Sequence, residues 1–449
     1  MSLPRFPEYK DSGVAWLGEV PRHWDVRKVR WLCEIKKRIS GELGHDVLSI
    51  TQQGIKIKDL ESNDGQISMD YSKYQFVEIG DFAMNHMDLL TGYVDISEVY
   101  GVTSPDYRVF SIRDKRASYD KYVLYLFQMG YKNKIFYAFG QGSSQLGRWR
   151  LPAEQFNDFF FPLPPLEEQQ IIAAFLDRET GKIDALIAEQ QRLVELLVEK
   201  RQAVISHAVT KGLNQNARIK DSGIEWLGEV PEHWEIGGLT RFIGPVVDYR
   251  GRTPTKVDEG IFLVTARNVR DGKIDYEASQ EFVDPESAAS LLARGKPEIG
   301  DLLFTMEAPL GQVALIDRID IALAQRIVKF RGMPKVIQNN FLLYWFMSAH
   351  CQARLETLAT GSTALGIKAS KLGMIECLVP PLDEQTAIAN YIDRETAKLD
   401  TLTAEANRAI ELLQERRSAL ISAAVTGKID VRPLVPSSQS GEGRALETV

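Results

Sequence analysis

The chain contains two copies of one plan, and this duplication restricts its fold more than any other feature of the sequence. Residues 10–24 read KDSGVAWLGEVPRHW and residues 220–234 read KDSGIEWLGEVPEHW, so twelve of fifteen positions are identical at an offset of 210. A second offset, of 216, relates PPLEEQ at 164–169 to PPLDEQ at 380–385. A repeat of this kind predicts two homologous units that are built by the same rules.

Between the repeated motifs lie two regions of similar length and little identity. They run from Trp24 to Pro164 and from Trp234 to Pro380, over spans of 140 and 146 residues. A short landmark persists in both, since Gly-Asp at 80–81 returns at 300–301. We interpret the two regions as diverged copies of one domain. Two similar frames with different surfaces predict two different ligand sites of the same kind.

A long helix is predicted after each Pro-Pro turn. Residues 167–209 contain no proline and one glycine, and their apolar residues recur at steps of 4, 7, 3, 7, 4 and 7. Proline and acidic residues suit the first turn of a helix, and a heptad seam indicates helices that pack along their length. Because the chain returns to a second copy of the same domain, the helices should be antiparallel. The predicted helix-pairing residues are Ile172, Leu176, Ile183, Leu186, Leu193, Leu197, Ile392, Leu399, Leu402, Leu413 and Leu420.

The predicted fold class is therefore α+β, with two homologous mixed α/β domains joined by two long antiparallel coiled-coil helices in a pseudo-twofold arrangement. The repeated tryptophan segments are expected to fasten each domain to a helix end by packing. The boundaries follow the repeats: a first domain at 1–165, a central helix at 166–212, a second domain at 213–380, a C-terminal helix at 381–430 and a disordered tail at 431–449.

Composition and missing motifs argue against several classes of function. The sequence has no apolar run of membrane-spanning length and no apolar signal core after Met1, so we expect a cytoplasmic protein that does not associate with a membrane. Three scattered cysteines fit neither a disulfide framework nor a zinc site. No phosphate-binding loop, amino-methyltransferase motif or metal spacing of histidines occurs. We predict a protein that is not an enzyme and has no catalytic, cofactor-binding or metal site.

The duplicated plan resembles the specificity subunits of type I restriction–modification systems. The likeness rests on the KDSG…WLGEVP…HW segments, the PPL(E/D)EQ helix starts and the Gly-Asp and Gly-Ser-(Ser/Thr) landmarks, and it covers residues 10–430. It implies that each diverged domain is a target-recognition domain that reads one half of an asymmetric bipartite target in double-stranded DNA. It also implies that the helices set the half-site spacing and dock two methyltransferase subunits.

The same resemblance assigns the chemistry to partner subunits. Restriction and translocase subunits are expected to join the complex. S-adenosylmethionine, ATP and magnesium are expected in the partners, and no cofactor is expected in this chain.

Candidates for DNA contact are basic, amide and hydroxyl side chains in turns of the two domains. Lysine and arginine hold phosphates, while amides can pair with adenine. Residues 49–58 of the first domain are expected to occupy the place of residues 267–273 in the second. With a net charge of −7, such sites must be local or completed by a partner. The predicted DNA-binding residues are Gln52, Gln53, Lys56, Lys58, Ser143, Ser144, Arg148, Arg150, Arg250, Arg252, Lys256, Arg267, Asn268, Arg270, Ser362, Thr363 and Lys368.

Two other functions are compatible with the sequence. One is the specificity component of another type of restriction–methylation enzyme, which the neighbouring genes would reveal. The other is a scaffold whose paired domains bind proteins and not DNA, in which case purified complexes would show no sequence-selective retention of DNA.

Overall fold

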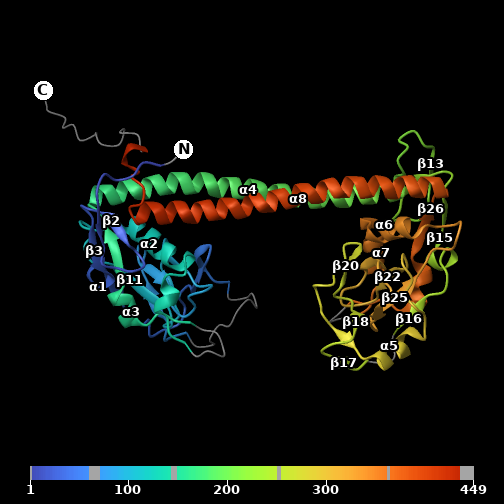
Figure 1. Cartoon of the computed structure of the whole chain (residues 1–449), viewed down its shortest axis with the longest axis horizontal. Helices are drawn as coiled ribbons and strands as arrows, with labels where there is room; N and C mark the ends of the chain where they lie inside the picture. Colours follow the sequence, from blue (N-terminus) through green and yellow to red (C-terminus); the bar gives the residue numbers. More distant parts are fainter. Residues whose placement is uncertain (1–2, 60–70, 143–148, 250–253, 362–364, 435–449) are drawn as a thin grey trace. The chain divides into compact units, whose positions relative to one another are not determined.

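The structure is a computed structural model that describes residues 3–59, 71–142, 149–249, 254–361 and 365–434. The chain forms two compact units, one made of residues 1–190 and 408–449 and the other of residues 191–407. Each unit holds one mixed α/β domain together with parts of two long helices, α4 (Leu166–Lys211) and α8 (Leu382–Val425). The colours of Figure 1 show that the first unit joins the start and the end of the chain.

The domain of the first unit is built on an antiparallel sheet with strand order β4-β11-β8-β9. Phenylalanines from β8, β11 and α2 form its core with Phe156 and Phe161. The strands are β1 (Tyr9–Asp11), β2 (Glu19–Pro21), β3 (Asp25–Lys28), β4 (Cys33–Lys36), β5 (Leu48–Thr51), β6 (Gly54–Ile57), β7 (Gln75–Val77), β8 (Phe82–Met84), β9 (Val94–Ile96), β10 (Gly101–Thr103), β11 (Arg108–Ile112) and β12 (Phe160–Leu163), and the helices are α1 (Val29–Leu32), α2 (Asp120–Lys132), η1 (Phe136–Phe139) and α3 (Ala153–Asp158).

The domain of the second unit repeats this plan, with the strand order β16-β25-β22-β23 in its central sheet. It adds a mixed sheet in which β18 pairs with β24 in parallel. The strands are β13 (Ile219–Asp221), β14 (Glu229–Pro231), β15 (Glu235–Gly238), β16 (Val247–Asp248), β17 (Lys256–Val257), β18 (Ile261–Val264), β19 (Val269–Arg270), β20 (Lys273–Ile274), β21 (Phe282–Val283), β22 (Leu302–Thr305), β23 (Val313–Leu315), β24 (Ile321–Leu323), β25 (Ile327–Phe330) and β26 (Glu376–Val379), and the helices are η2 (Leu239–Arg241), α5 (Pro285–Leu292), α6 (Asn339–Met347), α7 (Ala349–Leu358) and η3 (Ala369–Met374).

The repeated Gly-Asp landmark has the same structural role in both domains. Gly80 and Gly300 have φ values of +89° and +80°, which glycine adopts without strain. The carboxylate of the aspartate that follows accepts the backbone N–H of the residue three positions before it. The N···O distance is 2.9 Å for Asp81 and 3.0 Å for Asp301. Each buried carboxylate is also paired with an arginine on a neighbouring segment. The landmark is therefore a turn that supports the sheet.

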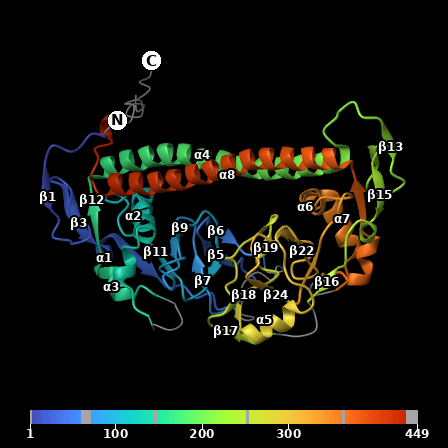
Figure 2. The same cartoon turned by 45° about the vertical axis from the view of Figure 1, so that its right-hand side comes forward.

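The two long helices run side by side, as Figures 1 and 2 both show. Their pairing is antiparallel within each unit, because Arg417 binds Asp184 at 2.8 Å in the first unit and Arg201 binds Asp400 in the second. Both members of one ion pair are related to those of the other by the offset of 216, so the contact is duplicated. The predicted antiparallel helix pair is confirmed.

The seam of this pair differs from the predicted one in its middle. Leu186, Leu193 and Leu402 are 45%, 40% and 47% exposed, so these three predicted pairing residues were wrong. The positions turned inward are buried or half-buried and continue in heptad steps from Ile183 to Leu197, through Ile187, Gln190 and Val194. The inward series at Leu399, Thr403, Ala406, Ile410 and Leu413 is its copy. Some of these positions hold small or polar residues, so a pattern of leucines in the sequence does not identify the seam.

The other predicted pairing residues lie toward the helix ends. Ile172 and Leu176 join the core of the first domain together with Ile421 and Val425 of α8, while Leu420 packs against its edge. Ile392 belongs to the core of the second domain. These residues therefore join the helix ends of each unit to the core of its own domain.

One tryptophan in each unit connects the ends of both helices. Trp24 donates its indole N–H to Glu168 in the first turn of α4 at 3.0 Å, and Trp234 donates to Glu384 in α8 at 3.0 Å. A histidine adjoins each tryptophan, with Nε2 within 2.8 Å and 2.6 Å of the same carboxylate. We call this the tryptophan junction. The packing role predicted for the repeated tryptophans is confirmed, with a polar anchor in addition.

The same tryptophans pack against the opposite helix ends. Gly427 follows α8 and Gly212 follows α4, with φ of +74° and +72°, as expected for glycine at a helix C-terminus. A Cβ atom at Gly427 would lie 3.2 Å from the Trp24 ring, and one at Gly212 would lie 3.1 Å from the Trp234 ring. Each tryptophan thus contacts the start of one helix and the end of the other.

The glutamine of each PPL(E/D)EQ motif completes the junction. Gln169 donates its amide to the carbonyls of Ala117 and Pro164 at 3.0 Å and 2.8 Å, and it accepts the N–H of Tyr119 at 2.8 Å. Gln385 makes the three equivalent bonds at 2.7–2.8 Å. The motif therefore fixes the helix start to the domain that precedes it.

The two units differ in how the end of a long helix is linked to the tryptophan segment of the same unit. In the second unit the chain runs covalently from the end of α4 into the tryptophan segment. In the first unit the equivalent connection is non-covalent, because Asp430 donates its N–H to the Pro4 carbonyl at 2.9 Å and the Tyr9 hydroxyl donates to the Gly427 carbonyl at 3.1 Å. Val431 is buried and Arg432–Leu434 form a 3-10 turn, η4, so these residues do not belong to the predicted disordered tail. Residues 435–449 lie outside the described residues.

The junction predicts unequal effects from one substitution made in both units. Trp24→Phe keeps a six-membered aromatic ring and removes the five-membered ring whose N–H donates to Glu168; the Glu168 side chain is 6% exposed, whereas that of Glu384 is 38% exposed. We expect Trp24→Phe to lower the free energy of unfolding by about 2 kcal/mol and Trp234→Phe by about half as much, because water replaces the lost donor at Glu384. Urea unfolding followed by circular dichroism measures both, and equal losses would contradict this account.

The corrected seam predicts which apolar side chain of α4 matters for stability. Ile183 is 5% exposed and Leu186 is 45% exposed. Ile183→Ala should lower the free energy of unfolding by about 3 kcal/mol, because it leaves a cavity in the seam. Leu186→Ala is the matched control and should change that free energy by less than about 1 kcal/mol. Thermal or urea unfolding compares them, and the reverse order would restore the register predicted from the sequence.

Candidate nucleic-acid interface

In the first domain, the predicted DNA-contact residues from 52 to 58 lie on the hairpin of β5 and β6. Gln52 and Gln53 are exposed at its turn, where the hydroxyl of Thr51 accepts the N–H of Gln53 at 3.1 Å. Lys56 is exposed and donates to the side-chain oxygen of Gln53 at 2.6 Å, while Lys58 is half-exposed. This hairpin therefore presents amides and ammonium groups on one short turn.

The second domain presents a hairpin of β19 and β20 at the equivalent place. Figure 2 shows β5 and β6 beside β9, and β19 and β20 contact β23, which takes the position of β9 in its sheet. The two hairpins therefore contact equivalent strands of their sheets. The turn of the second hairpin is Asp271-Gly272, with φ of +49° and +83°, a conformation typical of tight hairpins.

Asn268 was wrongly predicted to contact DNA, because its side chain is buried and fully bonded. It is 0% exposed, accepts the N–H and the hydroxyl of Thr265 at 2.9 Å, and donates to the carbonyls of Asp275 and Ser279 at 2.8 Å. No hydrogen-bonding group of this amide remains for a base. Asn268 instead holds the entry to the hairpin in shape.

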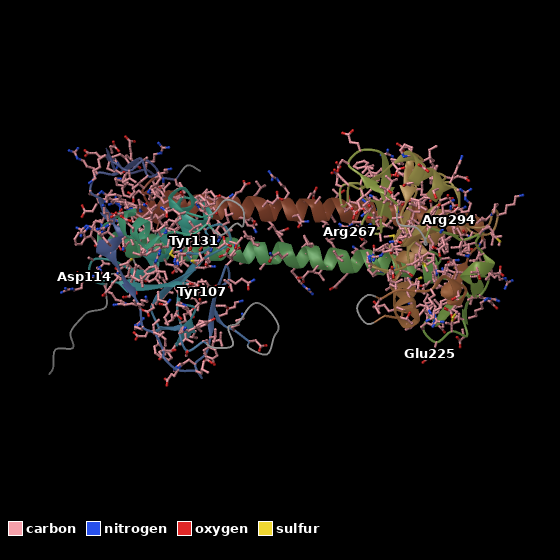
Figure 3. All side chains as sticks on the ribbon, turned by 90° about the horizontal axis from the view of Figure 1, so that it is seen from below. Tyr107, Asp114, Tyr131, Glu225, Arg267 and Arg294 are labelled. Atoms are coloured by element: carbon pink, nitrogen blue, oxygen red, sulfur yellow. The ribbon has the colours of Figure 1, made fainter. Side chains whose placement is uncertain are left out.

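Its neighbour Arg267 is exposed and lines a pocket of about 270 Å³. Figure 3 labels Arg267 in the second unit. Lys256 and Arg326 line the same pocket, and they pair with Glu281 at 2.7 Å and with Glu307 at 3.2 Å. Arg267 forms no ion pair with any residue in the described part of the chain. The pocket therefore combines an uncompensated guanidinium with the hydroxyl of Thr265 and the amide of Gln325.

The remaining predicted contacts divide into exposed residues and residues that cannot be placed. Arg150 and Lys368 are exposed, and Arg270 is exposed with its guanidinium 3.8 Å from the Asp275 carboxylate. Arg326 and Gln325 were missed, because they follow β24 at a point that only the tertiary fold brings beside Arg267. The predicted contacts that lie outside the described residues are Ser143, Ser144, Arg148, Arg250, Arg252, Ser362 and Thr363.

The described residues offer no metal centre. No group of three or more histidine, cysteine or acidic side chains among them is placed to hold a metal ion. The three cysteines are buried and free, and burial raises the pKa of each thiol above its ordinary value. None of the helices in the described ranges is both long enough and apolar enough to cross a membrane.

Comparison with known proteins identifies one family. The family described as "Type I restriction modification DNA specificity domain" matches residues 21–196 and 294–412. The MjaX specificity subunit assigned to a type I restriction enzyme of Methanocaldococcus jannaschii is 23% identical over 442 residues, covering 93% of this chain and 96% of that protein. The EcoBI type I specificity subunit of Escherichia coli is 24% identical, covering 75% and 72% of the two chains.

One solved structure has a similar fold over most of the chain. That structure describes complex assembly and conformational transition of the type I R-M system. The TM-score is 0.66 at 13% sequence identity, and the match covers 90% of this chain and 98% of the other. At 13% identity this comparison shows a shared fold and nothing more.

The contrast between neighbouring residues 267 and 268 is testable. Arg267→Ala should leave the unfolding temperature unchanged and weaken DNA binding, because it removes an exposed cation. Asn268→Ala should lower the free energy of unfolding by about 2–3 kcal/mol, because it leaves buried polar groups unpaired. Differential scanning fluorimetry and fluorescence anisotropy with duplex DNA measure both effects. Full DNA affinity in Arg267→Ala would remove Arg267 from the interface.

Proposed function

The chain belongs to the family of type I restriction–modification DNA specificity subunits, and from this we propose that each of its domains reads one half of an asymmetric bipartite DNA target. Specificity subunits of this family are non-catalytic, since catalysis lies in partner subunits. What remains to be assigned is which parts of this chain meet the DNA and which meet the partners.

The observation that carries the proposal is the pair of equivalent hairpins with different side chains. The hairpins contact equivalent strands, β9 and β23, yet the first presents Gln52, Gln53 and Lys56 while the second presents Arg270 and Lys273 and no amide. Amides favour adenine, and arginine favours guanine. Equivalent placement with unlike chemistry supports two half-sites of different sequence. Backbone phosphates would be held by the exposed cations Lys56, Arg150 and Lys368.

We further propose that the paired helices dock two methyltransferase subunits and set the half-site spacing. Exposed leucines recur on the two helices at the offset of 216. Leu186 and Leu402 are 45% and 47% exposed, and Leu196 and Leu412 are 45% and 48% exposed. A duplicated apolar surface of matching exposure fits two copies of one partner. In the first unit, Leu186 also lines an apolar groove with Phe175 and Leu420.

The proposed complex leaves the chemistry to its other subunits. S-adenosylmethionine would bind to the methyltransferase subunits, and ATP and magnesium to restriction and translocase subunits. The assembly would act on chromosomal and invading DNA in the cytoplasm. The acidic net charge of −7 is compatible with this arrangement, because partner subunits can enclose the DNA from other sides.

A domain exchange tests the division of the target. Replacing residues 25–163 with the recognition domain of another type I subunit should change one half of the methylated sequence and preserve the other half. The matched control replaces residues 235–379 and should change only the other half. Long-read sequencing of methylated DNA from cells that express each chimaera measures both halves. Loss or change of both halves in every folded chimaera would contradict the proposal.

A further inference from the structure

The first domain contains a buried arginine that the second domain does without. Arg108 lies on β11 and pairs with Met84 of β8. Met84 is the third residue after Asp81 of the Gly-Asp landmark. In the second domain the residue three after Asp301 is Phe304, and its partner on β25 is Val328. Arg108 and Val328 therefore occupy the same place in the common sheet, and both are buried at 6% and 0% exposure. The same sheet therefore forms with a valine at this position.

Arg108 has no acidic partner to compensate its charge. Its Nη2 donates to the Leu151 carbonyl at 3.0 Å, and its guanidinium carbon lies 4.5 Å from the Phe156 ring centre. Its Nη1 is buried without a hydrogen-bond partner. Burial lowers the pKa of Arg108 to about 10, and no carboxylate in the described part of the chain acts on that pKa. A buried cation without an opposite charge is unfavourable, and an anionic ligand nearby would offset that cost.

Two further basic residues are linked to Arg108 through the backbone of Leu151. The Leu151 N–H donates to the His86 carbonyl at 2.9 Å, and Leu151 directly follows Arg150, whose N–H and C=O pair with Gln141. His86 Nδ1 is also buried without a partner. Burial, followed by the fields of Arg108 and Arg150, lowers the pKa of His86 to about 4. Both guanidinium charges therefore act at one imidazole.

Asp88, an acidic residue that acts on the same tyrosine as Arg108, is already engaged. Asp88 affects the pKa of Tyr131, whose hydroxyl donates to the Asn85 carbonyl at 2.6 Å. The Asp88 carboxylate accepts the N–H groups of Leu90 and Thr91 at 2.9 Å and 3.0 Å. Figure 3 labels Tyr131 within the first unit. Arg150 is exposed and forms no ion pair with any described residue, so it marks the open side of the cluster.

We propose that Arg108, His86 and Arg150 form an anion site in the first recognition domain that takes one backbone phosphate of the DNA. Arg150 contacts the phosphate from the surface. Arg108 is a positioning residue. Its hydrogen bond holds the Leu151 carbonyl, and with it the adjoining Arg150, and its guanidinium supplies a fixed positive charge. A phosphate contact orients the domain on the duplex without reading its sequence. The inference rests on the proposed function.

The test replaces Arg108 with the residue of the sister domain, Arg108→Val, and with the longer Arg108→Met. Both are assembled with the methyltransferase subunits of the same system and bound to a duplex that carries the mapped target. Because the phosphate contact of Arg150 depends on the segment that Arg108 holds, we expect specific affinity to fall about tenfold and the slope of log K against log salt to weaken by about 0.9, the change for loss of one phosphate contact. The methylated sequence should stay the same. Arg38→Leu is the control, because it breaks the pair with Asp81 and should lower stability without changing the slope.

A neutral phosphate analogue locates the contact. Methylphosphonate placed singly along the duplex should weaken wild-type binding at each contacted phosphate in the half-site of the first domain. At one of these positions, the phosphate bound by Arg150, the same substitution should affect Arg108→Met by less than about twofold, because the two changes then remove one interaction. Equal losses in both proteins at every position would overturn the anion site, as would an unchanged salt slope in both Arg108 variants. If the wild-type complex did not distinguish its target from a scrambled duplex, the proposed function itself would fall instead.

Discussion

The indole of one tryptophan, donating to a carboxylate at a helix start, is the contact on which each half of this protein depends. Trp24 and Glu168 make it in one unit, and Trp234 and Glu384 make it in the other. Because the same rings also lie against Gly427 and Gly212, each tryptophan brings together the start of one long helix and the end of its partner. Removing the donor would take the hydrogen bond from one carboxylate oxygen at the point where domain and helices meet, while the other oxygen keeps its histidine.

This junction explains why the duplicated motifs are so similar while the domains between them have diverged. The tryptophan segment, the glutamate and the glutamine of PPL(E/D)EQ must fit one another closely, so little change is compatible with the joint. The hairpins on β9 and β23 have no such restriction beyond the shape of their turns. The chain therefore combines a constant frame with two variable surfaces. The first unit completes the frame without a covalent link, through Pro4 and Tyr9 against the end of α8.

Sequence patterns predicted the duplication and the antiparallel helices, because each depends on spacing that the sequence displays directly. They failed where tertiary context decides. Leu186 and Leu193 are strong apolar residues and were assigned to the seam, yet the seam turns Ile187 and Val194 inward. Asn268 has suitable chemistry for a base, but the backbone around it uses all of its hydrogen bonds. Arg108 gave no signal, since only strand register reveals that it replaces a valine.

The central claim is that this chain gives its complex two unlike half-site preferences. The most direct measurement is a map of methylated bases in the genome of a host that carries the complete system, compared with the same host after deletion of this chain. The account predicts a single motif with two different half-sites separated by a fixed gap, present only when the chain is present. A palindromic or uninterrupted motif, or a motif that persists without the chain, would contradict it.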